Sequence, residues 1–256
     1  MSSSRGKFVW YELMTTDIDA AENFYRDVLG WEVRDSGMPG IIYRLLRTAE
    51  ADIGGMMVIP ETVTQAGGRP SWIGYVAVDD VDASAGFASR LGGTIHHAPE
   101  DIPGVGRFAV IADPQGAVTC LFKGAGALRT ELPGGTPGDV GWRELSTTDR
   151  EAGFAFYAEL FGWAKGDAID MGPLGIYQLF TIADIPCGGM MTKAAEQPRS
   201  VWAYYFNVAE IDAAITCVAD SGGRVLDGPM QVPGGSWIAH ALDPLGAAFA
   251  MVGPRA

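Results

Sequence analysis

The pattern of apolar and polar positions predicts one order of elements that recurs along the chain. The run FVWYELMTT, from Phe8, reads as a strand, and Asp17 after it is typical of a helix N-cap. In IDAAENFYRDVLG the apolar residues follow helical spacing, and Gly30 marks the end of that helix. Three short strands are then predicted near 31–36, 41–47 and 52–58.

A second unit of the same kind follows. SWIGYVAVDD predicts a strand, and VDASAGFASRLGG predicts a helix closed by a glycine pair. Strands are expected near 94–99, 106–112 and 117–123, with the turn DPQG joining the last two as a hairpin.

The two halves of the chain repeat each other. WYELMTTDIDAAENFYRDVLGW begins at Trp10, and WRELSTTDREAGFAFYAELFGW begins 132 residues later at Trp142. GGMM and the turn D-P-x-G recur downstream, with offsets between about 130 and 134. We therefore expect one domain over 1–123, a linker rich in Gly and Pro over 124–139, and a second domain over 140–256.

This order predicts an α+β fold. Four strand–helix–strand–strand–strand (βαβββ) modules would pair into two domains. Each domain would have an open, curved mixed sheet with helices on its outer face.

Composition narrows the classes of function. Of the 256 residues 48% are hydrophobic, which is ample for a packed core, and the formal net charge is −13. That charge opposes nucleic-acid binding and suits a cationic small ligand, although acidity also simply aids solubility. Three widely spaced cysteines argue against a disulfide scaffold or a CxxC metal site. No run approaches the ~18 apolar residues of a membrane helix, and no apolar leader is evident, so we expect a cytoplasmic protein.

Recurring motifs give the chain a family resemblance. T-T-D, then F-Y, then G-W occur in order in each half, and D-P-x-G precedes each half's last strand. The chain thereby resembles the vicinal oxygen chelate superfamily of glyoxalase I, extradiol dioxygenases and bleomycin-resistance proteins. More narrowly, it is similar to actinobacterial two-domain glyoxalase-like proteins labelled "hydroxylase" or linked to antibiotic clusters. Because this fold hosts lyases, isomerases, dioxygenases and plain binders, the resemblance implies the fold more than the activity.

The resemblance also implies where metal ligands would lie, on the first and last strands of each module. Those positions hold Trp10, Trp142, Ile73, Ala203, Cys120 and Ala250, with a further position near Met56 and Met190. Of these only Cys120 is a usual ligand, and the chain has three histidines in all. We therefore expect no metal and no cofactor.

Strand alternation indicates what lines the expected cup instead. It places Trp10, Glu12 and Met14 on one face of the first strand. The predicted ligand-binding residues are Trp10, Met56, Tyr75, Cys120, Trp142, Met190, Tyr205, Asn207 and Trp237. The neighbouring methionines 57 and 191 are alternatives to Met56 and Met190, and the Trp and Met side chains could also fill the cup as core.

Three side chains are candidate catalytic acids or bases: Glu12, Glu144 and His240. A carboxylate in a central strand is costly to bury unless it is paired. A structural alternative therefore pairs each glutamate with Arg44, Arg107 or backbone amides.

These observations leave several functions open. The first is a protein that binds a small aromatic or cationic organic molecule in the cup, as a monomer or homodimer, with no nucleic-acid or membrane partner. The second is a metal-free enzyme that tailors an aromatic natural product by hydration, ring closure or proton transfer. A metal-dependent lyase or dioxygenase and a protein-interaction module are further alternatives.

Overall fold

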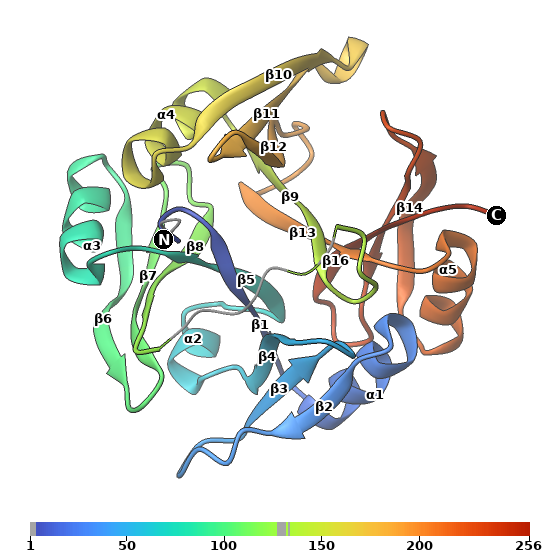
Figure 1. Cartoon of the computed structure of the whole chain (residues 1–256), viewed down its shortest axis with the longest axis horizontal. Helices are drawn as coiled ribbons and strands as arrows, with labels where there is room; N and C mark the ends of the chain where they lie inside the picture. Colours follow the sequence, from blue (N-terminus) through green and yellow to red (C-terminus); the bar gives the residue numbers. More distant parts are fainter. Residues whose placement is uncertain (1–3, 127–131, 133) are drawn as a thin grey trace. The chain divides into compact units, whose positions relative to one another are not determined.

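The computed structural model describes residues 4–126, 132 and 134–256 (Figure 1). Residues 127–131 and 133 of the predicted linker lie outside this description. The first module is β1 (Phe8–Thr15), α1 (Ile18–Leu29), β2 (Glu32–Asp35), β3 (Tyr43–Arg47) and β4 (Asp52–Val58). A short helix, α2 (Glu61–Gln65), follows and was not predicted.

The other three modules follow the same order. The second is β5 (Ser71–Ala77), α3 (Val81–Arg90), β6 (Thr94–Ile102), β7 (Gly106–Ala112) and β8 (Val118–Gly124). The third is β9 (Val140–Thr147), α4 (Arg150–Phe161), β10 (Ala164–Asp170), the 3-10 turn η1 (Gly172–Leu174), β11 (Ile176–Ile182) and β12 (Ile185–Thr192). The fourth is β13 (Val201–Asn207), α5 (Ile211–Asp220), β14 (Arg224–Gln231), β15 (Trp237–Leu242) and β16 (Ala248–Gly253).

Each half of the sequence forms one open eight-stranded sheet. The strand orders are β2-β3-β4-β1-β5-β8-β7-β6 and β10-β11-β12-β9-β13-β16-β15-β14. Both are mixed, since the first and last strands of a module pair parallel and its hairpins pair antiparallel. The predicted α+β fold of four βαβββ modules is confirmed.

The predicted helix ends are also confirmed. The Asp17 carboxylate accepts hydrogen bonds from two backbone amides of the first turn of α1, and Gly30 ends the helix in the left-handed conformation at φ 70°. For α4 the Asp149 carboxylate accepts from one backbone amide, that of Ala152, and Gly162 ends the helix at φ 79°. Among the described residues no helix is long and apolar enough to cross a membrane.

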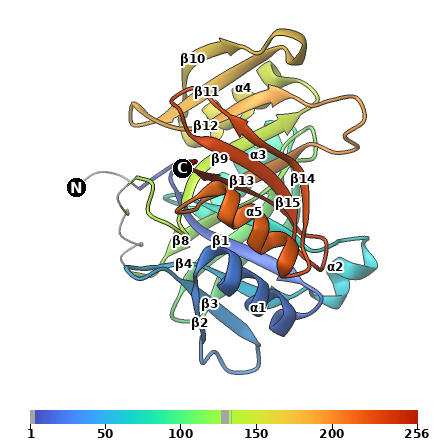
Figure 2. The same cartoon turned by 90° about the vertical axis from the view of Figure 1, so that its right-hand side faces the viewer.

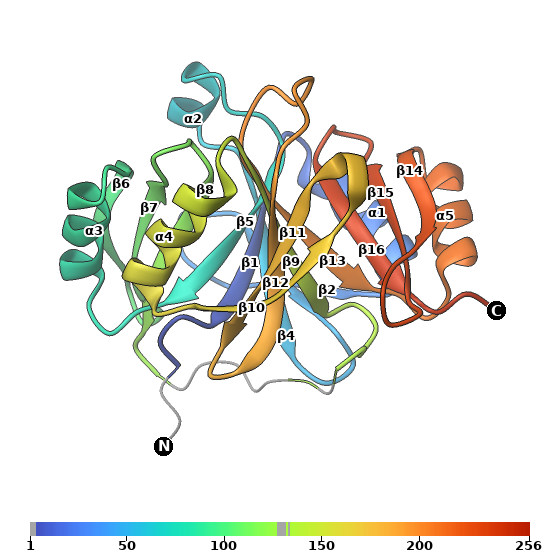
Figure 3. The ribbon, with the colours of Figure 1, turned by 90° about the horizontal axis from the view of Figure 1, so that it is seen from above.

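Tertiary contacts divide the chain into two compact units, each of which takes modules from both halves. The first unit comprises the described parts of Met1–Val9, Ile73–Leu128 and Arg143–Trp202, and the second those of Trp10–Trp72, Arg129–Trp142 and Ala203–Ala256. In the first unit α3 packs beside α4 (Figure 3). In the second α1 packs beside α5, which lies across β14 and β15 (Figures 1 and 2).

A buried hydrogen-bonded relay joins the two modules of the second unit. Trp72 Nε1 donates to the Tyr25 hydroxyl at 2.9 Å, and that hydroxyl donates to Asp243 Oδ2 at 3.2 Å. The other oxygen of Asp243 accepts from the backbone amides of Leu245 and Ala247. The tyrosine of the F-Y motif therefore contacts the aspartate of the D-P-x-G motif, which gives both motifs a structural role.

The first unit contains the same relay. Trp202 Nε1 donates to the Tyr157 hydroxyl at 3.0 Å, which donates to Asp113 Oδ2 at 3.1 Å. Indole rings stack on both tyrosines, with Trp31 on Tyr25 and Trp163 on Tyr157. These aromatic clusters form the centre of each unit's core.

Burial gives these carboxylates a predictable effect on the pH dependence of stability. Desolvation raises the pKa of Asp243 and of Asp113 above the ordinary value, and hydrogen bonds only partly oppose this rise. Between the ordinary pKa and the raised one the folded state holds a proton that the unfolded state has lost. The free energy of unfolding should therefore fall as pH rises through this window.

We expect Asp243→Asn to remove this contribution, because asparagine does not titrate. The unfolding free energies of wild type and variant are measured in urea at several acidic pH values. Wild type should exceed the variant by the largest amount at the lowest pH. A difference that stays constant with pH would contradict a raised pKa.

Candidate functional site

Strand register decides which side chains of β1 and β4 lie on the face opposite α1. Glu12 pairs with Gly55, and Leu13 pairs with Met56. Paired residues share a face, so Met57 lies with Glu12, whereas Met56 is fully buried beside Leu13 on the helix-covered side. The expectation that Met56 lines the open face is wrong by one residue.

The second half shows the same register. Met190 pairs with Leu145 and is fully buried, and Met191 pairs with Ser146 on the other face. The prediction for Met190 is corrected in the same way. Alternation along one strand fixes which of its residues share a face, but a neighbouring strand must be paired with it before that strand's own face is known.

A tyrosine that sequence reasoning missed covers the open face of β4. The Tyr43 ring lies over Gly55, where a Cβ atom would come within 2.3 Å of the ring. Its hydroxyl accepts a hydrogen bond of 2.8 Å from Trp10 Nε1. Gly55 is thus a close-approach glycine, and Trp10 and Tyr43 form one half-buried aromatic surface.

The first unit repeats this arrangement with Tyr177, whose ring lies 2.1 Å from where a Cβ of Gly189 would be. Both tyrosines follow an isoleucine, in IYRLL and IYQLF, and this recurrence is the signal that could have identified them.

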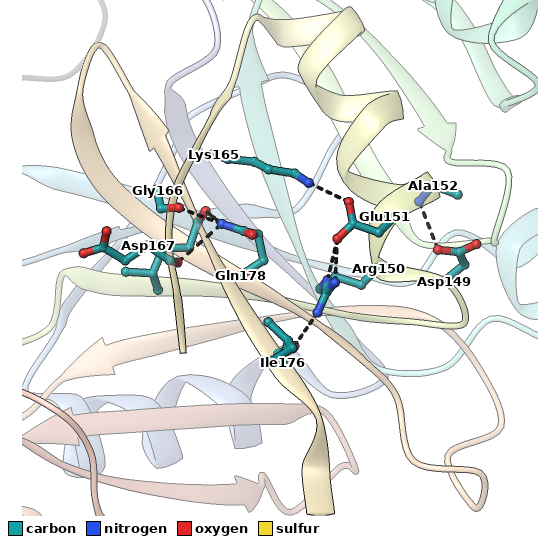
Figure 4. A network of polar contacts seen from close by, with 10 residues as sticks. Asp149, Arg150, Glu151, Ala152, Lys165, Gly166, Asp167, Ile176 and Gln178 are labelled. Carbon is teal, nitrogen blue, oxygen red and sulfur yellow. Dashed lines mark hydrogen bonds and ion pairs between the residues drawn. The ribbon is translucent and has the colours of Figure 1, made fainter. Parts of the chain in front are cut away.

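A polar network positions the strand that carries Tyr177 (Figure 4). The buried Gln178 amide donates to the carbonyls of Gly166 and Asp167 at the irregularity of β10. Arg150 on α4 donates to the carbonyl of Ile176 at 3.1 Å. These bonds fix β11 on both sides of Tyr177.

Exposed charges complete this network. Glu151 bridges Arg150 and Lys165, at 2.5 Å from each. Hydrogen bonds from Lys165 and Arg150 hold the pKa of the Glu151 carboxyl below its ordinary value. Because Glu151 and Lys165 are solvent-exposed and Arg150 is only half-buried, the pairs serve mainly to orient α4 against β10 and contribute little stability.

The two repeated glutamates have different surroundings. Glu12 is buried, at 8% exposed, and Glu144 is half-buried. The arginines suggested as their partners bind other carboxylates: Arg44 pairs with Asp19 and Glu22 of α1, and Arg107 pairs with Asp82 and Asp101. Arg44 and Arg107 thus bind carboxylates of α1, α3 and β6, and the partners of Glu12 and Glu144 stay a prediction.

In the second unit Tyr205 and His240 meet across the sheet. Tyr205 on β13 pairs in register with Ala250 on β16, and Ala250 pairs with His240 on β15. The Tyr205 hydroxyl and His240 Nε2 lie 2.9 Å apart, and their rings meet edge to face. The structure therefore joins a predicted ligand-binding residue to a predicted catalytic one.

The equivalent row in the first unit carries different chemistry. Tyr75 pairs with Cys120 and Cys120 pairs with Val110, so valine occupies the position that histidine has in the second unit. Tyr75 meets Phe122 edge to face, and Cys120 is fully buried. This row is more apolar than its counterpart.

The remaining predicted residues are dispersed. Asn207 lines an open pocket of about 340 Å³ together with Val252 and the loop 234–236. Trp237 lies three residues before His240 on β15 and therefore on the opposite face, as their spacing indicates, with the Arg255 guanidinium 4.6 Å from its ring centroid. Trp142 is half-buried on β9.

The positions implied for metal ligands do not fit a divalent metal. Cys120 and Ala250 occupy equivalent places beside Tyr75 and Tyr205, but they offer one thiol and one methyl group. Within the described ranges, no three His, Cys, Asp or Glu side chains gather in a way that could hold a metal ion.

Comparison with known proteins gives consistent matches over both halves. The sequence profile described as the Glyoxalase/Bleomycin resistance protein/Dioxygenase superfamily matches residues 7–121 and 140–251. CFP32 of Mycobacterium tuberculosis is 30% identical over 247 residues, covering 96% of this chain and 94% of that protein.

Two further relatives extend the comparison. The anthracycline biosynthesis protein DauV of Streptomyces sp. (strain C5) is 30% identical over 262 residues, covering 96% of this chain and 93% of DauV. Among solved structures, the Mn(II)-bound glyoxalase from Novosphingobium aromaticivorans has a TM-score of 0.65 and 17% identity, covering 98% of this chain and 83% of that one. The structural likeness at this identity concerns the fold alone.

Proposed function

Because the chain belongs to the glyoxalase/bleomycin resistance protein/dioxygenase superfamily, we propose that it binds a planar aromatic small molecule without a metal ion. The observation that carries this proposal is the surface formed by Trp10 and Tyr43 over Gly55. Gly55 leaves room for the Tyr43 ring, whose hydroxyl accepts a hydrogen bond from the Trp10 indole. Together the two rings offer an aromatic surface on which a planar ring can stack.

Two further observations support this ligand class. The relationship to DauV, which is named for anthracycline biosynthesis, favours a fused aromatic ring system. The formal net charge of −13 favours a ligand that also carries a cationic group.

We expect 1,4-dihydroxyanthraquinone, a planar hydroxyquinone, to quench tryptophan fluorescence and bind saturably. Tyr43→Leu should weaken its binding about tenfold, because loss of an aromatic stacking partner costs about 1–1.5 kcal/mol. Isothermal titration calorimetry gives the dissociation constants.

Trp237→Phe is the matched control, because Trp237 lies away from this surface and should bind the probe as wild type does. Treatment with a chelator should also leave binding unchanged. No binding by wild type, equal binding by Tyr43→Leu, or loss of binding after chelation would each contradict part of the proposal.

A second candidate function is metal-free tailoring of the bound molecule by proton transfer. The Tyr205–His240 hydrogen bond favours it, since histidine is the side chain most suited to acid–base work near neutral pH.

A further inference from the structure

The contact between Tyr205 and His240 depends on the small residue between them. Their strands, β13 and β15, are separated by β16, so the side chains start from backbones about two strand spacings, ~9–10 Å, apart. Ala250 offers only a methyl group at the crossing point, and the phenol reaches over it to the imidazole. In the first unit the slightly larger Cys120 takes the place of Ala250, and Val110 takes the place of His240.

The hydrogen bond leaves one ring nitrogen for a ligand. Nε2 is engaged by Tyr205, which is buried at 2% exposed, while His240 is only half-buried. Nδ1 has no hydrogen-bond partner within the part of the chain that the structure describes. Tyr205 thus orients the His240 ring through Nε2, and Nδ1 can accept a hydrogen bond from a ligand.

We propose that His240 exchanges a proton with the bound ligand and that Tyr205 is its positioning residue. This rests on the proposed function and narrows the ligand to an aromatic compound with an ionisable hydroxyl next to a carbonyl, such as a hydroxyquinone. The proton transfer itself needs no oxidant, reductant or other reactant.

In this step neutral His240 carries its hydrogen on Nε2 and donates it to the Tyr205 oxygen. The lone pair on Nδ1 takes the proton of the ligand hydroxyl, whose O–H bond breaks and leaves its electron pair on the ligand oxygen. The imidazolium then returns the proton from Nδ1: return to the same oxygen restores the starting ligand, whereas delivery to a ring carbon gives a keto–enol isomerisation.

The groups around His240 come from the neighbouring strands and from α5. Asp227 lies opposite it in register on β14, with one carboxylate oxygen accepting from the amide of Gly228. On the β16 side the neighbour is the uncharged Ala250, followed by Tyr205 on β13. Helix α5 packs on the other face of these strands.

The repeat supplies a matched control for this proposal. Val110 occupies the position of His240 in the first unit, so the fold already accepts valine there. His240→Val should therefore fold, and Val110→Ala should alter neither the binding nor the ionisation of the probe.

The test uses 1,4-dihydroxyanthraquinone, whose visible absorption reports ionisation of its hydroxyl. Bound to wild type, the probe should ionise about one pH unit below the free probe, a tenfold shift in its acid dissociation constant. His240→Val should still quench tryptophan fluorescence but lose this shift. Tyr205→Phe should reduce the shift and change the ¹⁵N chemical shifts of the His240 ring in the ligand-free protein.

The outcomes separate this inference from the proposed function. If wild type does not bind the probe, both the proposed function and this inference are overturned. If the probe binds but ionises at the same pH on wild type and His240→Val, only the inference is overturned. Unchanged ¹⁵N chemical shifts of the His240 ring in Tyr205→Phe would show that Tyr205 does not position His240.

Discussion

Gly54→Ala should prevent the second unit from folding stably. A Cβ at this position would lie 2.2 Å from the backbone carbonyl oxygen of Tyr11, on the strand that pairs with β4. Because a backbone atom cannot rotate away, relief requires separation of β1 from β4. We expect a loss of about 3 kcal/mol or more in the free energy of unfolding, measured by chemical denaturation.

The adjacent glycine provides the control. In Gly55→Ala the new methyl group would meet the end of the Tyr43 ring, which can rotate out of the way. This variant should stay folded at a cost of about 1–2 kcal/mol, lose the Trp10–Tyr43 hydrogen bond, and bind the hydroxyanthraquinone more weakly. Equal stability of the two variants would contradict the distinction between backbone and side-chain contact.

Tyr25→Phe should also lower stability strongly, by about 2–4 kcal/mol. Removal of one hydroxyl leaves two buried groups without this partner, the indole N–H of Trp72 and Oδ2 of Asp243. Each such group costs about 1–3 kcal/mol. Burial also raises the pKa of Tyr25 well above its ordinary value, so the hydroxyl remains a donor in wild type. Urea denaturation followed by circular dichroism measures the change.

The relay offers two internal comparisons for this variant. Tyr157→Phe breaks the equivalent relay in the first unit and should cost a similar amount. Adding Trp72→Phe to Tyr25→Phe removes the indole donor that Tyr25→Phe alone leaves without this acceptor. The double variant should therefore lose less unfolding free energy than the sum of the two single losses. A neutral surface substitution changes the unfolding free energy by about 0.5 kcal/mol or less. A change of that size for Tyr25→Phe would refute a structural role for the relay.

The motifs that identified the family were visible in the sequence, but their pairing was not. F-Y and D-P-x-G read as separate markers along the chain. In the folded protein Tyr25 bonds Asp243, 218 residues away, and Tyr157 bonds Asp113, 44 residues away. Nothing in local spacing distinguishes these partners from the alternatives, because each contact depends on which modules pack together.

The candidate site shows the same division. Alternation along β1 was enough to place Trp10 and Glu12 on one face, and the sequence offered Tyr205 and His240 as candidates by their residue type and predicted strands. That Tyr205 and His240 touch follows from the pairing of three strands and from the small side chain of Ala250. Tyr43 became visible as part of the site only through its contact with Gly55.

Local sequence patterns were sufficient for the four modules, their helix caps and the repeat of the two halves, since helical and strand periodicity and capping involve residues a few positions apart. Three-dimensional pairing was needed to choose Met57 over Met56, to match each tyrosine with its aspartate and to bring Tyr205 to His240. These outcomes depend on register and packing between residues far apart in the chain, and a shift of one residue in register reverses every side chain of a strand.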